Sequence, residues 1–148
     1  MSFVRPVLVF LFLVFLVGIC WGTLQHELVR YDGPAKRPRG KVTDYRGEPI
    51  PGVDVAVYDN PQVWDEESQS SAEKRSKQKM IASAVTDQKG IFNVRGVPKG
   101  QYEVEFSRMG WNTLSLVLNI DPRSRAEDLC VELPISGGAG EYKVKSCH

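Results

Sequence analysis

The chain has 148 residues, of which 42% are hydrophobic, enough for one ordinary hydrophobic core and little more. Its 19 Lys and Arg side chains nearly cancel its 18 Asp and Glu side chains, so the formal net charge is +1. So small an excess charge produces no strong field for nucleic acid or anionic lipid, and we expect no nucleic-acid binding. The composition favours a single domain with appendages.

The first segment, residues 1–25, reads MSFVRPVLVFLFLVFLVGICWGTLQ and carries no charge from Pro6 to Gln25. Its apolar run falls between the length of a signal-peptide core and that of a full membrane span, and we expect a hydrophobic helix. Three fates stay open: cleavage after Gly22, retention as a membrane anchor through residues 6–25, or lipid attachment at Cys20. Lys and Arg are denser after the segment than before it. For an uncleaved helix this favours a cytoplasmic domain.

Residues 26–38 contain two prolines, a glycine and scattered charge without a period, which is typical of a linker. A period of two begins after Arg39. Val53, Val55 and Val57 alternate with other side chains, as expected of a half-buried strand. Prolines and glycines just before this strand predict a turn, because Pro lacks the ladder donor and Gly tolerates positive φ; its key residues are Gly47, Pro49 and Gly52.

An excursion at residues 60–79 interrupts the strand rhythm. Acidic side chains come early and basic ones late, without an apolar stripe, which indicates a solvated helical turn or a loop. Trp64 is its one large aromatic side chain. We expect Trp64 either to fasten the excursion to the domain or to contact a partner protein or a sugar. The run SAEKRSKQK is interpreted as a solvated face.

Alternation returns at residues 80–120. Asp87 and Gly90 predict a tight turn, after which Phe92 points inward. The sequence GVPKGQY predicts another turn, with Pro98, Gly100 and Tyr102 at its end, and four alternating apolar residues from Leu114 to Ile120 predict a further strand. Short strands separated by turns every 8 to 12 residues predict an all-β sandwich of about seven strands with Greek-key connections.

The C-terminal residues LCVELPISGGAGEYKVKSC predict a hairpin that turns in the glycine-rich stretch, so that residues 136–148 form an arm. Cross-strand partners then place Cys130 opposite Cys147, which suits a disulfide and an oxidising compartment. The alternative is two unrelated free thiols. This register gives four pairs: Leu133 with Val144, Ile135 with Tyr142, Glu132 with Lys145, and Cys130 with Cys147.

Two stretches, GKVTDYRGEPIPGVDVAV and AVTDQKGIFNVRGVPKGQYEVEFSRMGW, resemble the carboxypeptidase regulatory-like domain over residues 39–135. The resemblance implies a transthyretin-like, or carbohydrate-binding-like, β-sandwich that acts as a non-catalytic accessory module. The matched turn and core positions are Gly47, Pro49, Gly52, Asp87, Gly90, Phe92, Pro98, Gly100 and Tyr102.

No catalytic constellation stands out. The two histidines, His26 and His148, lie at the ends of the chain, and we expect neither an enzyme nor a cofactor. Four aspartates suggest calcium only weakly, since they belong to separate turns, and turn capping is the preferred interpretation; they are Asp44, Asp54, Asp59 and Asp87.

We therefore expect an exported module, periplasmic or extracellular, that binds or scaffolds an unknown protein or glycan of the cell envelope. The excursion and its neighbouring turns are the expected partner surface. Two alternatives are a carbohydrate-binding module that uses Trp64 and a structural protein that pairs through a sheet edge.

Overall fold

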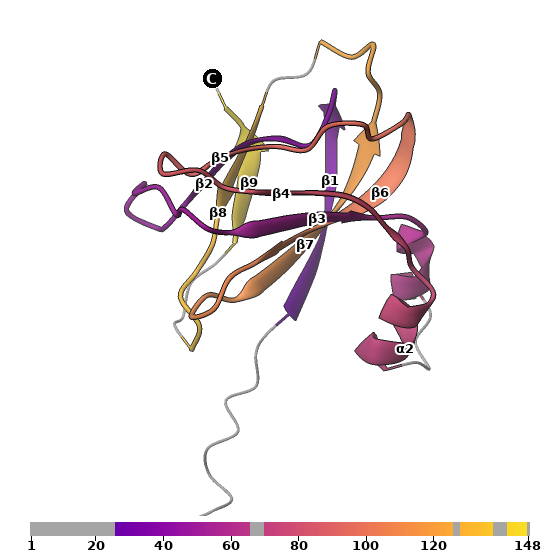
Figure 1. Ribbon diagram of the computed structural model, residues 1–148, viewed down its shortest axis with the longest axis horizontal. Coiled ribbons are helices and arrows are strands. Elements are labelled where there is room, and N and C mark those ends of the chain that lie inside the picture. The colour runs from indigo at the N-terminus through magenta and orange to yellow at the C-terminus, as the bar shows by residue number, and fades with distance from the viewer. Residues whose placement is uncertain (1–25, 66–69, 126–127, 138–141, 148) are drawn as a thin grey trace, which may run out of the picture.

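The computed structural model describes residues 26–65, 70–125, 128–137 and 142–147. Two β-sheets pack face to face, with a short helix at one end of the sandwich (Figure 1). The elements are β1 (His26–Ala35), β2 (Arg39–Thr43), β3 (Asp54–Tyr58), the 3-10 helix η1 (Pro61–Asp65), α2 (Ser71–Ser76), β4 (Met80–Val85), β5 (Ile91–Asn93), β6 (Gly100–Ser107), β7 (Thr113–Ile120), β8 (Leu129–Glu132) and β9 (Lys143–Ser146).

The five-stranded sheet has the order β1-β7-β6-β3-β4, and the four-stranded sheet has the order β5-β2-β8-β9. Most neighbours are antiparallel, but β1 runs parallel to β7 and β2 runs parallel to β8. Both β1–β2 and β7–β8 connections therefore pass from the first sheet to the second at the same end of the sandwich. The predicted all-β sandwich is confirmed, with mixed sheets.

The core lies between the two sheets and follows the predicted alternation. The three valines of the β3 region are fully buried, as are Phe92 and Phe106, whose rings meet edge to face with centroids 5.3 Å apart. The other large buried side chains include Val42, Val104, Leu114, Leu116, Leu118, Ile120, Leu129 and Leu133.

Two D-x-x-G turns have the same geometry. In each, the aspartate carboxylate accepts from the backbone N–H groups two and four residues later, and the glycine adopts positive φ: Asp44 with Gly47 (φ 83°) and Asp87 with Gly90 (φ 72°). The other predicted turn positions lie as follows: Gly52 has φ 72°, Pro49 bridges to Thr43, Pro98 is exposed, and Gly100 opens β6 before the half-buried Tyr102.

The predicted linker at residues 26–38 is wrong for most of its length, because His26–Ala35 forms β1. This strand pairs with the edge of β7, and its register shifts between Arg30 and Pro34. Backbone pairing does not need alternating apolar side chains, and a strand bonded on one side tolerates proline at an irregularity.

The C-terminal hairpin is present, but its predicted register is wrong by two residues. Val131 lies opposite Val144, and Cys130 lies opposite Lys145. A shift of two keeps each side chain on its face. Cys147 therefore lies diagonally across from Cys130, with their Cα atoms 5.2 Å apart, and the two cysteines form a disulfide.

The expected N-terminal helix and the fates of Cys20 and residues 6–25 lie outside the described residues. Over the described ranges, no helix has the length and apolar character that crossing a membrane requires.

Candidate functional site

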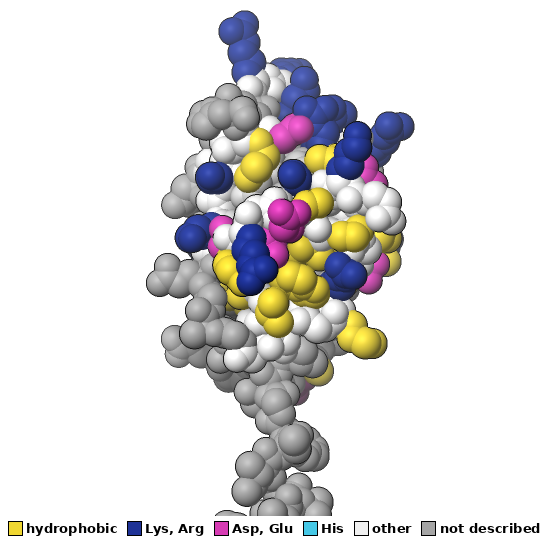
Figure 2. Space-filling view, turned by 90° about the vertical axis from the view of Figure 1, so that its left-hand side faces the viewer, with side chains coloured by type: hydrophobic (Ala, Val, Ile, Leu, Met, Phe, Trp, Pro, Cys, Tyr) yellow, Lys and Arg dark blue, Asp and Glu magenta, His cyan; other side chains and the backbone are white. Residues whose placement is uncertain are grey.

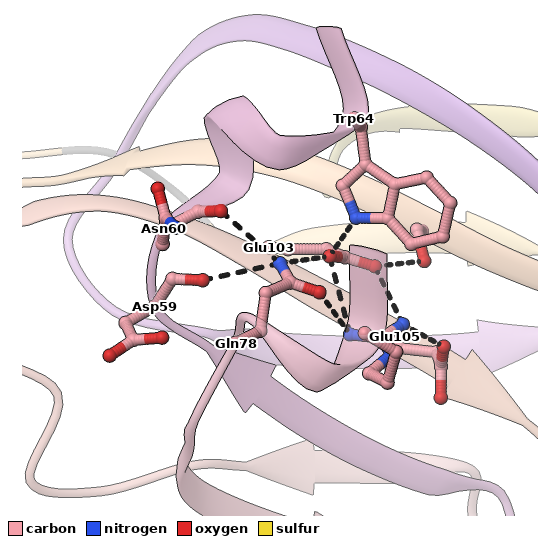
Figure 3. Close-up of polar contacts among 8 residues, drawn as sticks. Asp59, Asn60, Trp64, Gln78, Glu103 and Glu105 are labelled. Atoms are coloured by element: carbon pink, nitrogen blue, oxygen red, sulfur yellow. Dashed lines mark hydrogen bonds and ion pairs between the residues drawn. The ribbon is translucent and has the colours of Figure 1, made fainter. Parts of the chain in front are cut away.

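The excursion folds onto the outer face of the five-stranded sheet, where Glu103 of β6 forms the centre of a polar cluster (Figure 3). Alternation along β6 turns Glu103 away from the core, yet its exposed fraction is 0% because η1 and α2 cover it. The sequence analysis assigned no role to this side chain.

Four side chains donate hydrogen bonds to the Glu103 carboxylate. Trp64 Nε1 and Gln78 Nε2 bind Oε2, the latter at 2.7 Å, while Ser115 Oγ of β7 binds Oε1 at 2.6 Å. The guanidinium of Arg75 reaches both oxygens, at 3.3 and 3.0 Å. Figure 3 shows Trp64 and Gln78 converging on Glu103 from different parts of the excursion.

These donors determine the ionisation of Glu103. Burial opposes the charged carboxylate, but hydrogen bonds from Ser115 and Gln78, the charge of Arg75 and the hydrogen bond from Trp64 outweigh it and hold the pKa of Glu103 below its ordinary value. The charged carboxylate therefore fastens two segments of the excursion, residues 61–65 and 71–78, to the sheet.

Arg75 extends the cluster across the sheet surface. It also pairs with Glu105 and donates to Gln78 Oε1 at 2.9 Å. Its guanidinium lies 3.9 Å from the centroid of the Tyr58 ring, a cation–π distance. Burial, together with the charge of Glu105, raises the pKa of Tyr58 above its ordinary value.

Local sequence explains why the excursion takes this shape. Ser70 and Glu73 form a capping box, in which each side chain binds the other residue's backbone N–H, so α2 begins at a defined residue. Asn60 has φ 49°, a left-handed conformation that Asn tolerates, and turns the chain out of β3. Gln78 donates to the carbonyls of Asp59 and Asn60, which closes the base of the excursion.

Lys74 corrects the interpretation of SAEKRSKQK as a solvated face. Its exposed fraction is only 9%, and its Nζ donates to the Trp64 carbonyl at 3.3 Å. The ammonium lies 5.7 Å from the centroid of the Trp64 ring. One turn of α2 thus places Lys74 and Arg75 against the sheet side of the excursion.

An open groove of about 520 Å³ lies beside this cluster, on the outer face of β4, β3 and β6. Tyr58, Met80 and Glu105 line its end nearest the excursion, and Val85 lines the opposite end. Val85 is 59% exposed and Met80 is 53% exposed, while Ala82 and Ala84 take the inward positions of β4. Among the described strands, β4 pairs only with β3, so its other edge faces outward.

The structure brings few of the predicted site residues together. Trp64 fastens the excursion, since its indole N–H binds Glu103 and its ring lies near two cations. The side chains of His26 and His148 lie outside the described residues. Over the residues described, no three His, Cys, Asp or Glu side chains gather in a metal-binding group. The aspartates are separate: Asp44 and Asp87 cap turns, Asp59 accepts from the Lys79 N–H, and Asp54 lines the groove.

The architecture is a two-sheet β-sandwich with an inserted helical excursion. The profile of the carboxypeptidase regulatory-like domain matches residues 39–133, well over half of the sequence. The chain belongs to this family.

Two solved structures are similar in fold. Sea bream transthyretin, in complex with thyroxine, is 21% identical with a TM-score of 0.45, and the match covers 74% of this chain and 94% of that one. Klebsiella pneumoniae 5-hydroxyisourate hydrolase is 14% identical with a TM-score of 0.46, and the match covers 74% and 96%. A comparison with curated proteins finds no match.

Proposed function

We propose that the chain is an exported, non-catalytic module that binds or scaffolds a partner protein through the groove beside the excursion. The observation that carries this proposal is the Glu103 cluster, which makes the excursion a fixed wall of the groove. Because the buried charge of Glu103 fixes the excursion, the groove has a defined shape in the free protein, and this lowers the entropic cost of binding a partner.

The cluster itself supports a structural role over a catalytic one. A general base needs a lone pair that can take a proton from substrate. Glu103 directs its oxygens to four donors of the protein, and its lowered pKa makes it a weak base. A buried carboxylate with these partners stabilises an arrangement of segments.

The mode that we propose is addition of an extended partner segment along β4. An open strand edge offers backbone donors and acceptors, and the groove beside it offers places for alternate side chains. Val85 and Met80 supply apolar contacts there, and Asp54 and Glu105 supply charge. The C-terminal hairpin extends the other sheet, through β8 and β9, and none of the described strands pairs with the outer edge of β4.

The Glu103 cluster does not support a carbohydrate ligand stacked on Trp64, because the indole N–H binds Glu103 and two cations of the excursion lie near the indole ring. A glycan array with the native chain and Trp64→Phe tests this alternative. If the native chain binds a glycan and Trp64→Phe does not, the carbohydrate-binding function would replace the proposed partner binding at the groove.

Export is supported by the disulfide, which is typical of oxidising compartments. Periplasmic or extracellular placement, and anchoring through residues 6–25, are parts of the proposal. Intact mass of the protein purified from its native cells tests both, since cleavage, lipid attachment and loss of two thiol protons each change the mass.

The binding proposal is tested by affinity capture followed by mass spectrometry. We expect Ser83→Lys/Val85→Lys to lose a partner that the native chain retains, because lysines on an edge oppose pairing. The matched control, Ile91→Lys/Ile135→Lys, adds the same charge at exposed apolar positions elsewhere and should retain it. A second variant replaces residues 60–79 by a short Gly-Ser linker. Unchanged capture by both the lysine variant and the deletion would overturn the proposal.

A further inference from the structure

The two connections that cross between the sheets at one end of the sandwich both carry basic side chains. The β1–β2 connection contributes Lys36 and Arg37, with Arg39 opening β2, and the β7–β8 connection contributes Arg123 and Arg125. These groups are more than 80 residues apart in sequence. They meet because β1 lies parallel to β7 and β2 lies parallel to β8, which forces the connections to run side by side.

The basic side chains surround a pocket of about 360 Å³, which is within the size range of small-ligand sites. Its described lining holds five cationic side chains and one carboxylate, that of Asp128, so the local charge is +4 while that of the whole chain is +1. Figure 2 shows Lys and Arg side chains gathered at the upper end of the molecule. Charge that nearly cancels over the sequence is thus concentrated by the fold.

Most of this charge has no ion-pair partner among the described residues. Arg39 pairs with Asp128, and the charge of Arg123 interacts with that of Asp121. Within the described ranges no hydrogen bond or ion pair engages the side chains of Lys36, Arg37, Arg123 or Arg125. Like charges this close repel one another, and the repulsion is relieved when an anion with several charges binds between them. Four cationic side chains without a hydrogen-bond or ion-pair partner among the described residues therefore line the pocket, which suits an anion with several negative charges.

We propose that this pocket binds a compound that carries two or more phosphate groups. Guanidinium groups recognise phosphate through paired N–H donors, and four of the five cations are arginines. The pocket lies at the C-terminal end of β1, whereas His26 begins this strand. The ten residues of β1 therefore separate the pocket from the start of the described chain by roughly 30 Å. It is separate from the β4 groove and does not depend on the proposed function.

The protein is tested as the full chain by isothermal titration calorimetry with inorganic tripolyphosphate and with orthophosphate, at about 0.15 M salt, where charges beyond roughly 8 Å are screened. We expect tripolyphosphate to bind and orthophosphate to bind at least tenfold more weakly. Arg37→Ser/Arg123→Ser should weaken tripolyphosphate binding tenfold or more. The control Lys143→Ser/Lys145→Ser removes the same charge from exposed positions on β9 and should change binding less than twofold.

Sedimentation with vesicles distinguishes the source of the phosphate. The quantity compared is the excess binding to vesicles that contain cardiolipin, whose headgroup carries two phosphates, over phosphatidylcholine vesicles, so that the apolar N-terminal segment contributes equally to both. Excess vesicle binding that falls in Arg37→Ser/Arg123→Ser and is competed by tripolyphosphate identifies lipid phosphate as the source. Calorimetric binding of tripolyphosphate without excess vesicle binding identifies a soluble compound. Binding in neither assay, or equal loss in the two double variants, would overturn the proposal.

Discussion

Replacing Glu103 by glutamine tests the Glu103 cluster, because glutamine has almost the same shape as glutamate but carries no charge. Glutamine offers one acceptor oxygen and one amide donor in place of two acceptors. In its less costly orientation the amide nitrogen replaces Oε1, where the Ser115 hydroxyl can turn to accept and Arg75 keeps its pair with Glu105. The remaining oxygen still accepts from Trp64 and Gln78. The bonds from Trp64, Gln78 and Ser115 survive in some form, while the Arg75 bond to Oε1 is lost because two donors then face each other. No remaining bond is assisted by a negative charge on residue 103.

The magnitude follows from that loss of charge. A hydrogen bond to a charged group contributes about 1.5–3 kcal/mol to stability, against about 0.5–1.5 kcal/mol for a neutral one. Weakening the bonds from Trp64, Arg75 and Gln78 therefore costs about 3 kcal/mol, and the smaller desolvation penalty of a neutral amide offsets part of it. We expect Glu103→Gln to lower the free energy of unfolding by about 2 kcal/mol at pH 7.

The assay is urea unfolding followed by tryptophan fluorescence, with trypsin cleavage at Lys74 and Arg75 as a local measure of excursion release. The matched control is Glu105→Gln, two residues along the same strand, whose side chain is 18% exposed and holds one ion pair. It should cost less than about 1 kcal/mol, the usual limit for a partly solvated pair. The reasoning is refuted if the free energy of unfolding of Glu103→Gln lies within about 0.5 kcal/mol of that of the native chain, or if Glu105→Gln lowers it more than Glu103→Gln does.

Three further results are expected. Because the pKa of Glu103 is lowered in the folded state, its contribution to the free energy of unfolding is complete above the unfolded pKa of about 4.3 and is lost as pH falls through the folded pKa. The difference in unfolding free energy between the native chain and Glu103→Gln should therefore shrink below about pH 4. A constant difference from pH 7 to 3 contradicts this. Reducing the disulfide, which closes a separation of 17 residues, should cost about 3 kcal/mol in urea unfolding, whereas a change under 1 kcal/mol rejects the chain-entropy account. Gly47→Ala, where φ is 83° and a Cβ would meet open space, should lower the free energy of unfolding in urea by about 1–2 kcal/mol. Gly90→Ala should lower it clearly more, because its Cβ would lie 2.4 Å from the Val42 carbonyl oxygen. Equal losses in the two variants argue against this difference in packing.

The core strands could be predicted because their signals are local. Alternating valines in β3 and the D-x-x-G turns report directly on burial and positive φ. The strand β1 gave no such signal, since its pairing with β7 uses the backbone and its sequence lacks a period of two. The disulfide was predicted through a wrong register because a slip of two residues preserves which face each cysteine occupies.

The site could not be predicted from local pattern. Alternation with Val104 turns Glu103 out of the core, but outward positions are solvated only where no other segment covers them, and the excursion covers this one. Trp64, Arg75 and Gln78 lie 25 to 39 residues away in sequence. The basic pocket likewise depends on two parallel strand pairings that composition and net charge do not reveal.

Site-specific photocrosslinking in the native cells tests the proposed binding face most directly. A photoreactive amino acid at Ser83, exposed on the outer face of β4, should give a crosslinked adduct with a partner protein, while the same amino acid at Lys145, exposed on β9 of the other sheet, should not. An adduct from Lys145 and none from Ser83 would contradict the account.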